Sequence, residues 1–364
     1  MNRSRTYVLG ALALVIALGA ALGVRLLRAE DHDTPQHPAL NLVRHTEAAP
    51  AARVPAPAAL PAGPLEVPYW GSPAAMAEWP VAFRTNLDLL APLGDGPANA
   101  ALWLKDFMKA GGPRAAEAEA AMKRRVDGAS DLGKVLPPDD PFLREAEPWA
   151  DQATMRFYPD ILPIRGFETP IPNLLFSLNV AKSWVSRALA DPDAPGALDD
   201  CRRAIRWGRL LRQEGVTVIQ DLIGLACIRA GAQGIYDLAS RRGDSQTALV
   251  AAIVLGEHAP QRLRTQQLVS KLSVHDESGF RITDRKVEEL SEAIRALPDL
   301  RFRGEAIIQM AVVRSVGTRH QRELADEALR LGAATKDPVQ AALVRWAQES
   351  TFSKSDLAKM AGAE

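Results

Sequence analysis

The sequence is poor in the residues on which most recognisable active sites depend. Its 364 residues include two cysteines and six histidines. It lacks a CxxC pair, an HExxH motif, a GxSxG nucleophile turn and a complete phosphate-binding GxxxxGK(S/T) loop. Nothing therefore indicates a zinc site, a serine hydrolase or a nucleotide-binding loop, and we expect neither metal nor cofactor.

The sequence also lacks net charge. Lysine plus arginine and aspartate plus glutamate both number 44, so no overall field attracts a polyanion, and we expect no nucleic acid partner. Apolar residues make up 47%, enough for a buried core. Alanine is frequent, and 26 prolines fall mostly between alanine- and leucine-rich stretches. This composition predicts a mainly α fold of many helices interrupted by prolines.

Long apolar runs are absent except for one near the amino terminus. The run from Thr6 to Val24 has no charged residue and is flanked by arginines. As a helix it is roughly 28 Å long, close to the thickness of the hydrocarbon core. It predicts a single transmembrane helix, and the alternative is a cleaved secretory signal. Gly19 and Gly23 form a GxxxG pair on this helix, which could support a homodimer through the membrane span; the alternative is that small residues are simply frequent in an alanine-rich chain.

Proline and alanine dominate the next segment, as in APAARVPAPAALPAGP. Such a density of proline excludes helices and strands and predicts an extended tether. Three histidines lie in it, but they are too widely spaced on a flexible chain to predict a metal site: His32, His37 and His45. With the amino terminus in the cytoplasm, the bulk of the chain lies outside the inner (cytoplasmic) membrane.

The rest of the chain has the pattern of a helical domain. Ser72-Pro73 and similar pairs are typical helix starts. Expected helices are near 73–91, 97–110, 113–126, 141–157, 171–190, 196–213, 216–240, 283–296, 301–315, 319–332 and 337–349. Residues 241–282 show a less regular pattern, in which SVHDESGFRIT predicts a polar turn between two short alternating runs.

One stretch resembles a known family. NLLFSLNVAKSWVSRALADPDAPGALDDCRRAIRWGRLL, about residues 171–213, is similar to a tetratricopeptide-type helical pair, although ADPDAPG replaces the usual turn and no 34-residue period recurs. FRGEAIIQMAVVRSV and the segment after it resemble a HEAT-type hairpin. The resemblance implies an irregular array of antiparallel helical hairpins, tetratricopeptide-like or HEAT-like.

Two groups of residues are candidate binding sites. Arg202, Arg206 and Arg209 recur at helical spacing and form a basic stripe, which could grip an anionic polymer or lipid head group or simply face solvent. Arg165 and Glu168 are the polar residues of the proline-rich segment 158–173, which is apolar enough to pack onto the helices; there it could form a recognition surface or serve packing alone.

Each of the three histidines outside the tether has an interpretation that requires no catalytic or binding role. His258 precedes Ala259-Pro260, so we expect it at a helix end, where a cation is favourable. His275 is followed by two carboxylates in the expected polar turn, and His320 lies at a charged helix start.

The two cysteines, Cys201 and Cys227, are equally far from the expected turn at Glu214-Gly215. The sequence therefore predicts that they lie level across a helical hairpin, either as a disulfide or as buried free thiols.

These patterns divide the chain into five parts. A short cytoplasmic tail (1–5) precedes the membrane anchor (6–27) and the linker (28–68). A helical domain (69–350), with a sub-boundary near 270–283, is followed by a polar carboxy-terminal tail (351–364). The expected function is a membrane-anchored interaction or scaffold module that binds a protein or envelope polymer. The alternative is an envelope hydrolase or transferase with a carboxylate-based site.

Overall fold

The computed structural model describes residues 81–105, 107, 113–128, 132–158, 161–166, 169–213, 215–276, 279–280, 282–297, 300–353 and 355–356. The predicted membrane span with Gly19 and Gly23, the tether, and Glu168 all lie outside these residues. Among the helices described, none is long and apolar enough to cross a bilayer. Almost all of the described residues belong to one compact unit, Pro73–Ser353.

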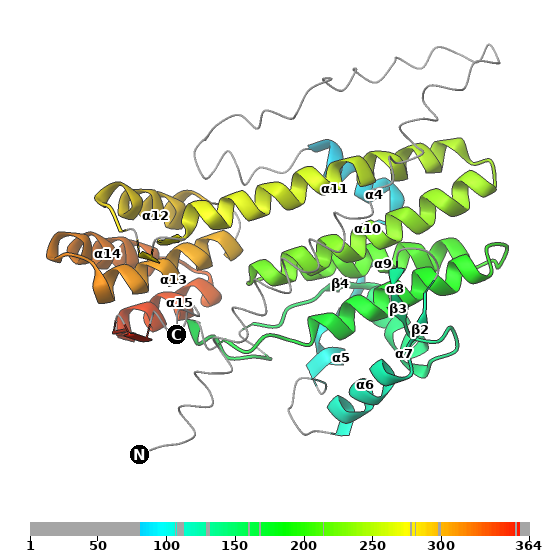
Figure 1. Ribbon diagram of the computed structural model, residues 1–364, viewed down its shortest axis with the longest axis horizontal. Coiled ribbons are helices and arrows are strands. Elements are labelled where there is room, and N and C mark those ends of the chain that lie inside the picture. The colour runs from blue at the N-terminus through cyan, green and yellow to red at the C-terminus, as the bar shows by residue number, and fades with distance from the viewer. Residues whose placement is uncertain are drawn as a thin grey trace, which may run out of the picture. The chain divides into compact units, whose positions relative to one another are not determined.

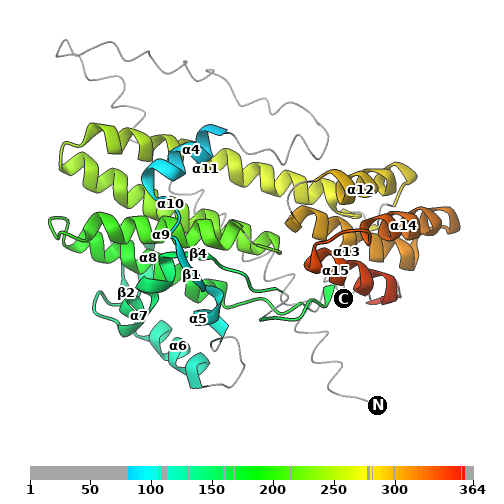
Figure 2. The same cartoon turned by 180° about the vertical axis from the view of Figure 1, so that it is seen from behind.

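The fold is mainly α, as the composition predicts (Figures 1 and 2). The first part of the described chain holds short elements: α4 (Val81–Leu90), β1 (Gly96–Asn99), α5 (Ala101–Lys105), α6 (Pro113–Lys123), β2 (Val126–Asp127), β3 (Lys134–Val135), α7 (Pro141–Ala150) and β4 (Gln152–Thr154). Strands β1 and β4 pair in parallel, and β2 and β3 pair antiparallel. The helix expected over 97–110 is therefore partly a strand, and the one expected over 141–157 ends at Ala150.

Four long helices follow: α8 (Leu174–Ala190), α9 (Ala197–Gln213), α10 (Val218–Arg241) and α11 (Ser245–Leu272). Consecutive helices of this group lie side by side, and α10 contacts the other three (Figures 1 and 2). Trp184 of α8 and Trp207 of α9 are fully buried between them, with ring centroids 6.0 Å apart. The indole N–H of Trp207 donates to Ser177 Oγ at 2.6 Å, so the ring is buried without leaving its donor unpaired.

The remaining elements are the antiparallel hairpin of β5 (His275–Asp276) and β6 (Gly279–Phe280), then α12 (Asp284–Ala296), α13 (Leu300–Val316), α14 (Arg319–Gly332) and α15 (Pro338–Glu349). The hairpin confirms the expected turn in SVHDESGFRIT. Helices α12, α13 and α14 contact one another, and α13 and α14 also contact α15. Capping explains their boundaries: Thr318 and Gln321 form a capping box at the start of α14, and Asp337 caps α15 just before Pro338.

Helix α11 was not expected at full length. It continues through Gly256 and Pro260, two residues that usually weaken or interrupt a helix. One face of it is buried on successive turns, with Val254, His258 and Thr265 among the buried residues, and it contacts α10, so tertiary packing outweighs the local cost of these residues. His258 consequently lies inside a helix, and its expected position at a helix end is wrong.

The cysteine register is also wrong. Helix α10 begins at Val218 after the cap Thr217, so the turn is centred later than Glu214-Gly215. Cys201 lies against Gly234, and Cys227 lies against Gly208. Cys201 also lies against Gly231, so the residues of α10 beside Cys201 are four to seven positions beyond Cys227, and the two cysteines are not level across the hairpin. Both are free, buried thiols.

The segment between β4 and α8 packs onto the helices, in agreement with its apolar composition. Gly166 has a φ of 56° and lies against the indole ring of Trp346 in α15, where any Cβ atom would overlap the ring. The hydroxyl of Tyr158 donates to the carbonyl of Pro170 at 2.5 Å and closes the segment on itself. Arg165 is exposed, and its backbone N–H donates to Thr169 Oγ1 at 2.9 Å.

Candidate functional site

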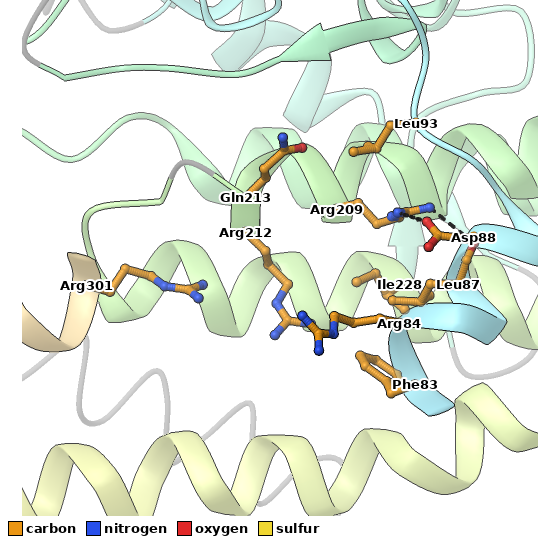
Figure 3. A pocket seen from close by; sticks show the side chains of 10 residues that line it. All are labelled: Phe83, Arg84, Leu87, Asp88, Leu93, Arg209, Arg212, Gln213, Ile228 and Arg301. Atoms are coloured by element: carbon orange, nitrogen blue, oxygen red, sulfur yellow. Dashed lines mark hydrogen bonds and ion pairs between the residues drawn. The ribbon is translucent and has the colours of Figure 1, made fainter. Parts of the chain in front are cut away.

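A pocket of about 360 Å³ opens where α4, α9, α10 and α13 approach one another (Figure 3). Four of its lining side chains are arginines, and one is a carboxylate: Arg84, Arg209, Arg212, Arg301 and Asp88. The arginines come from three helices that are far apart in the sequence. Of the four, Arg209 was a candidate from the sequence; Arg212, one turn further along α9, was not chosen, and Arg84 and Arg301 lie on helices that share no local pattern with it.

Arg209 attaches the end of α4 to α9. Its guanidinium donates to the carbonyl oxygens of Leu87 at 3.2 Å and Ala91 at 2.5 Å, and it pairs with Asp88. These carbonyls belong to the last turn of α4 and the residue after it, where a cation satisfies unpaired acceptors and interacts favourably with the helix dipole. Arg209 therefore holds one wall of the pocket in place.

Arg212 and Arg301 are held together by one buried carboxylate, Asp221 of α10. Arg212 Nε donates to Asp221 Oδ1 at 2.8 Å, Arg301 Nη1 pairs with the same oxygen, and Thr265 Oγ1 donates to Oδ2 at 2.9 Å. Asp221 is fully buried, and burial alone would raise its pKa. The two guanidinium groups outweigh this, so the pKa of Asp221 is lowered and it remains a carboxylate.

Arg84 differs from the other three arginines. It is exposed on α4, and within the described part of the chain its side chain has no hydrogen bond or ion pair. In Figure 3 its guanidinium lies beside that of Arg212. Two like charges held close together repel each other unless an anion lies between or next to them. Asp221 already compensates Arg212, so within the described part of the chain Arg84 is the guanidinium of this pair that has no carboxylate partner.

The rest of the wall is apolar. Phe83, Leu87 and Ile228 are buried side chains that line the pocket, and Leu93 is half-buried beside them. The guanidinium carbon of Arg212 is 6.0 Å from the centre of the Phe83 ring, within cation–π range. Apolar walls with a few convergent polar groups are typical of small-molecule sites.

A buried histidine lies next to this region on α11. Burial, reinforced by the charges of Arg229, Arg262 and Arg212, lowers the pKa of His258 to about 3, against a weaker opposing hydrogen bond to the backbone of Leu225. Its Nε2 has no hydrogen-bond partner among the described residues. His258 is therefore neutral at physiological pH and adds no charge to the arginine-rich region.

The other residues of the predicted basic stripe have structural partners. Arg202 pairs with Asp199 at 3.0 Å, and Arg206 pairs with Asp151, the C-cap of α7. Arg206 and Arg209 thus attach separate early elements to α9, and the structure does not bring the stripe together as one exposed surface. Arg165 does not line the pocket.

Comparison with protein-family models, with curated proteins and with solved structures found no match to this chain. The pocket is therefore interpreted from its own geometry.

Proposed function

We propose that this protein is a membrane-anchored binding module whose helical domain recognises an anionic group outside the cytoplasm. The anchor is the apolar run from Thr6 to Val24, followed by the proline-rich tether. We further propose that the domain is an irregular array of antiparallel hairpins, tetratricopeptide-like or HEAT-like. The succession of contacts from α8 to α11 and from α12 to α15 supports this architecture.

The arginine-lined pocket is the observation that carries the proposal. Arginine presents a planar fork of N–H donors that remains charged at any physiological pH and matches the oxygens of a carboxylate or phosphate. Asp221 fixes two of the four arginines, and Arg209 is fixed by the end of α4. Because these groups are already held in position, little side-chain entropy is lost when an anion binds.

The carboxylate-based enzyme receives less support. The one carboxylate that lines the described pocket, Asp88, is engaged by Arg209. Two carboxyl groups with pKa values moved apart would be expected at a general acid–base site, and this pocket offers only one.

Binding can be tested on the full chain in detergent by titration with phosphate, citrate and acetate at constant ionic strength. Wild type should bind at least one of these anions saturably. At a free anion concentration one hundred times the Kd, the free energy of unfolding should increase by about 2.7 kcal/mol. Arg84→Gln should weaken this binding. The matched control is Arg202→Gln, which removes an arginine from α9 outside the pocket.

If no anion binds saturably, or if Arg84→Gln binds anions as tightly as wild type and Arg202→Gln do, the pocket is not an anion site. The anchor is tested separately by carbonate extraction of membranes. A protein released by carbonate, or a mature chain that begins after the apolar run, would contradict the anchor.

A further inference from the structure

We infer that the pocket accepts a phosphate monoester that carries an apolar or aromatic group, an inference that rests on the proposed anion-binding function. The observations are the directions from which the arginines approach, the charge of the lining and the apolar wall. Each narrows the class of anion independently.

The arginines reach the pocket from different helices. Arg84 comes from α4, Arg212 from α9 and Arg301 from α13, so their N–H groups converge from separate directions (Figure 3). A carboxylate has two oxygens that lie in one plane, so a single guanidinium fork can pair with both of them. A phosphate monoester has three terminal oxygens in a tetrahedral arrangement, which donors from several directions can reach.

Charge favours a doubly charged group. Four guanidinium groups line the pocket against two carboxylates, Asp88 in the lining and Asp221 behind Arg212 and Arg301, so two positive charges among these groups are left uncompensated, and His258 nearby is neutral. A phosphate monoester carries a charge of about −1.5 to −2 at pH 7, whereas a carboxylate or a sulfate ester carries one. The exposed guanidinium of Arg84, beside that of Arg212, is the group that a second negative charge would engage.

The apolar wall and the size of the pocket indicate what is attached to the phosphate. A volume of about 360 Å³ is many times that of a water molecule and lies in the range of small-molecule sites. Phe83, Leu87 and Ile228 can contact an apolar group attached through the ester oxygen, with the phosphate facing the arginines. An inorganic ion would leave this wall unused.

The test compares matched probes by calorimetry on the full chain in detergent at pH 8. Phenyl phosphate, phenyl sulfate and benzoate share a ring and differ in charge or shape, and methyl phosphate lacks the ring. We expect phenyl phosphate to bind at least about tenfold more tightly than each of the others, the ratio that one further charge-assisted hydrogen bond supplies. Lowering the pH below the second phosphate pKa, about 6, should reduce its advantage over phenyl sulfate.

Arg84→Gln should reduce the preference for phenyl phosphate over phenyl sulfate to near one, because Arg84 serves the second charge. Arg202→Gln should keep the preference. Since Arg84 is exposed and makes no hydrogen bond among the described residues, its variant should unfold at the wild-type temperature without ligand, which shows that any loss of binding is local.

Equal binding of phenyl sulfate or benzoate would overturn the phosphate assignment while leaving the pocket an anion site. Equal binding of methyl phosphate would overturn the apolar part. If none of the probes binds, the proposed function itself fails. Two sources carry this chemistry, a phospholipid with its acyl chains and a soluble phosphate monoester with an aromatic group, and short-chain phosphatidate added as monomers is compared with phenyl phosphate. Tighter binding of phosphatidate identifies the lipid as the source and tighter binding of phenyl phosphate identifies a soluble ester. Both outcomes support the inference, whereas failure of both to bind more tightly than methyl phosphate overturns it.

Discussion

Gly208 of α9 and Gly224 of α10 face each other so closely that a Cβ atom on either would meet the carbonyl oxygen of the other. Gly224 also lies against the side chain of Arg212. Because small residues let two helix axes approach closely, this contact brings Arg212 of α9 within reach of Asp221 of α10. The glycine contact therefore determines the position of the pocket arginine as well as the packing of the hairpin.

Replacing Gly208 with alanine should destabilise the fold by about 1–3 kcal/mol, because the added methyl group meets backbone that cannot move without separating the helices. The control is Gly256→Ala in α11, where nothing lies within 4 Å of the added Cβ. That change should stabilise by about 0.5–1 kcal/mol through helix propensity. Urea unfolding measures both, and a destabilised Gly256→Ala or a neutral Gly208→Ala would contradict the packing.

Asp221→Asn should destabilise the protein by about 3–5 kcal/mol, because it leaves Arg212 and Arg301 buried beside a neutral amide. Asp199→Asn is the matched control: it breaks an exposed pair with Arg202 and should cost less than about 1 kcal/mol. The same urea experiment applies. Similar losses for both variants would mean that the buried cluster contributes no more than a surface ion pair.

Local patterns account for most of the helical fold. The helices from α8 to α10 and from α12 to α15 were predicted to within a few residues, because their alanine- and leucine-rich segments and the breaks between them are visible in the sequence. Helix α11 was not predicted, since Gly256 and Pro260 suggest an interruption that only packing against α10 overcomes.

The candidate site could not be predicted in the same way. Arg84 and Arg301 lie on helices that local patterns cannot place relative to α9, and Arg212 was hidden within an arginine-rich helix. Asp221 looked like an ordinary acidic residue in the first turn of a helix. Its burial against two arginines depends on how α9, α10 and α13 meet, which is a property of the tertiary structure.

Both cysteines should be titrated as free thiols in unfolded, non-reduced protein. In the folded protein neither should react rapidly with a thiol reagent, because both side chains are fully buried and burial raises the pKa of each thiol. Ellman titration with and without denaturant measures the two states. Loss of both thiols in the denatured, non-reduced sample would show a disulfide and would contradict the observed helix register.

The stability of the protein should fall as the pH decreases from about 6.5, because His258 is buried and its pKa is about 3. The unfolded chain has a histidine pKa of about 6.5, so between these values the unfolded state binds a proton that the folded state does not. The contribution of neutral His258 is therefore complete above pH 6.5 and is lost progressively towards pH 3.

Over the interval from pH 7 to pH 5 the loss attributable to His258 is about 2 kcal/mol, at 1.36 kcal/mol for each pH unit below 6.5. His258→Gln removes the titrating group, so its free energy of unfolding should fall by about 2 kcal/mol less than that of wild type over the same interval. His320→Gln removes an exposed histidine of α14 and is the control for loss of a histidine away from the buried position. Urea unfolding at pH 7, 6 and 5 measures all three proteins. Because other groups titrate alike in each of them, only the difference in slope reports on His258, and parallel slopes for wild type and His258→Gln would show that the histidine is not buried in its neutral form.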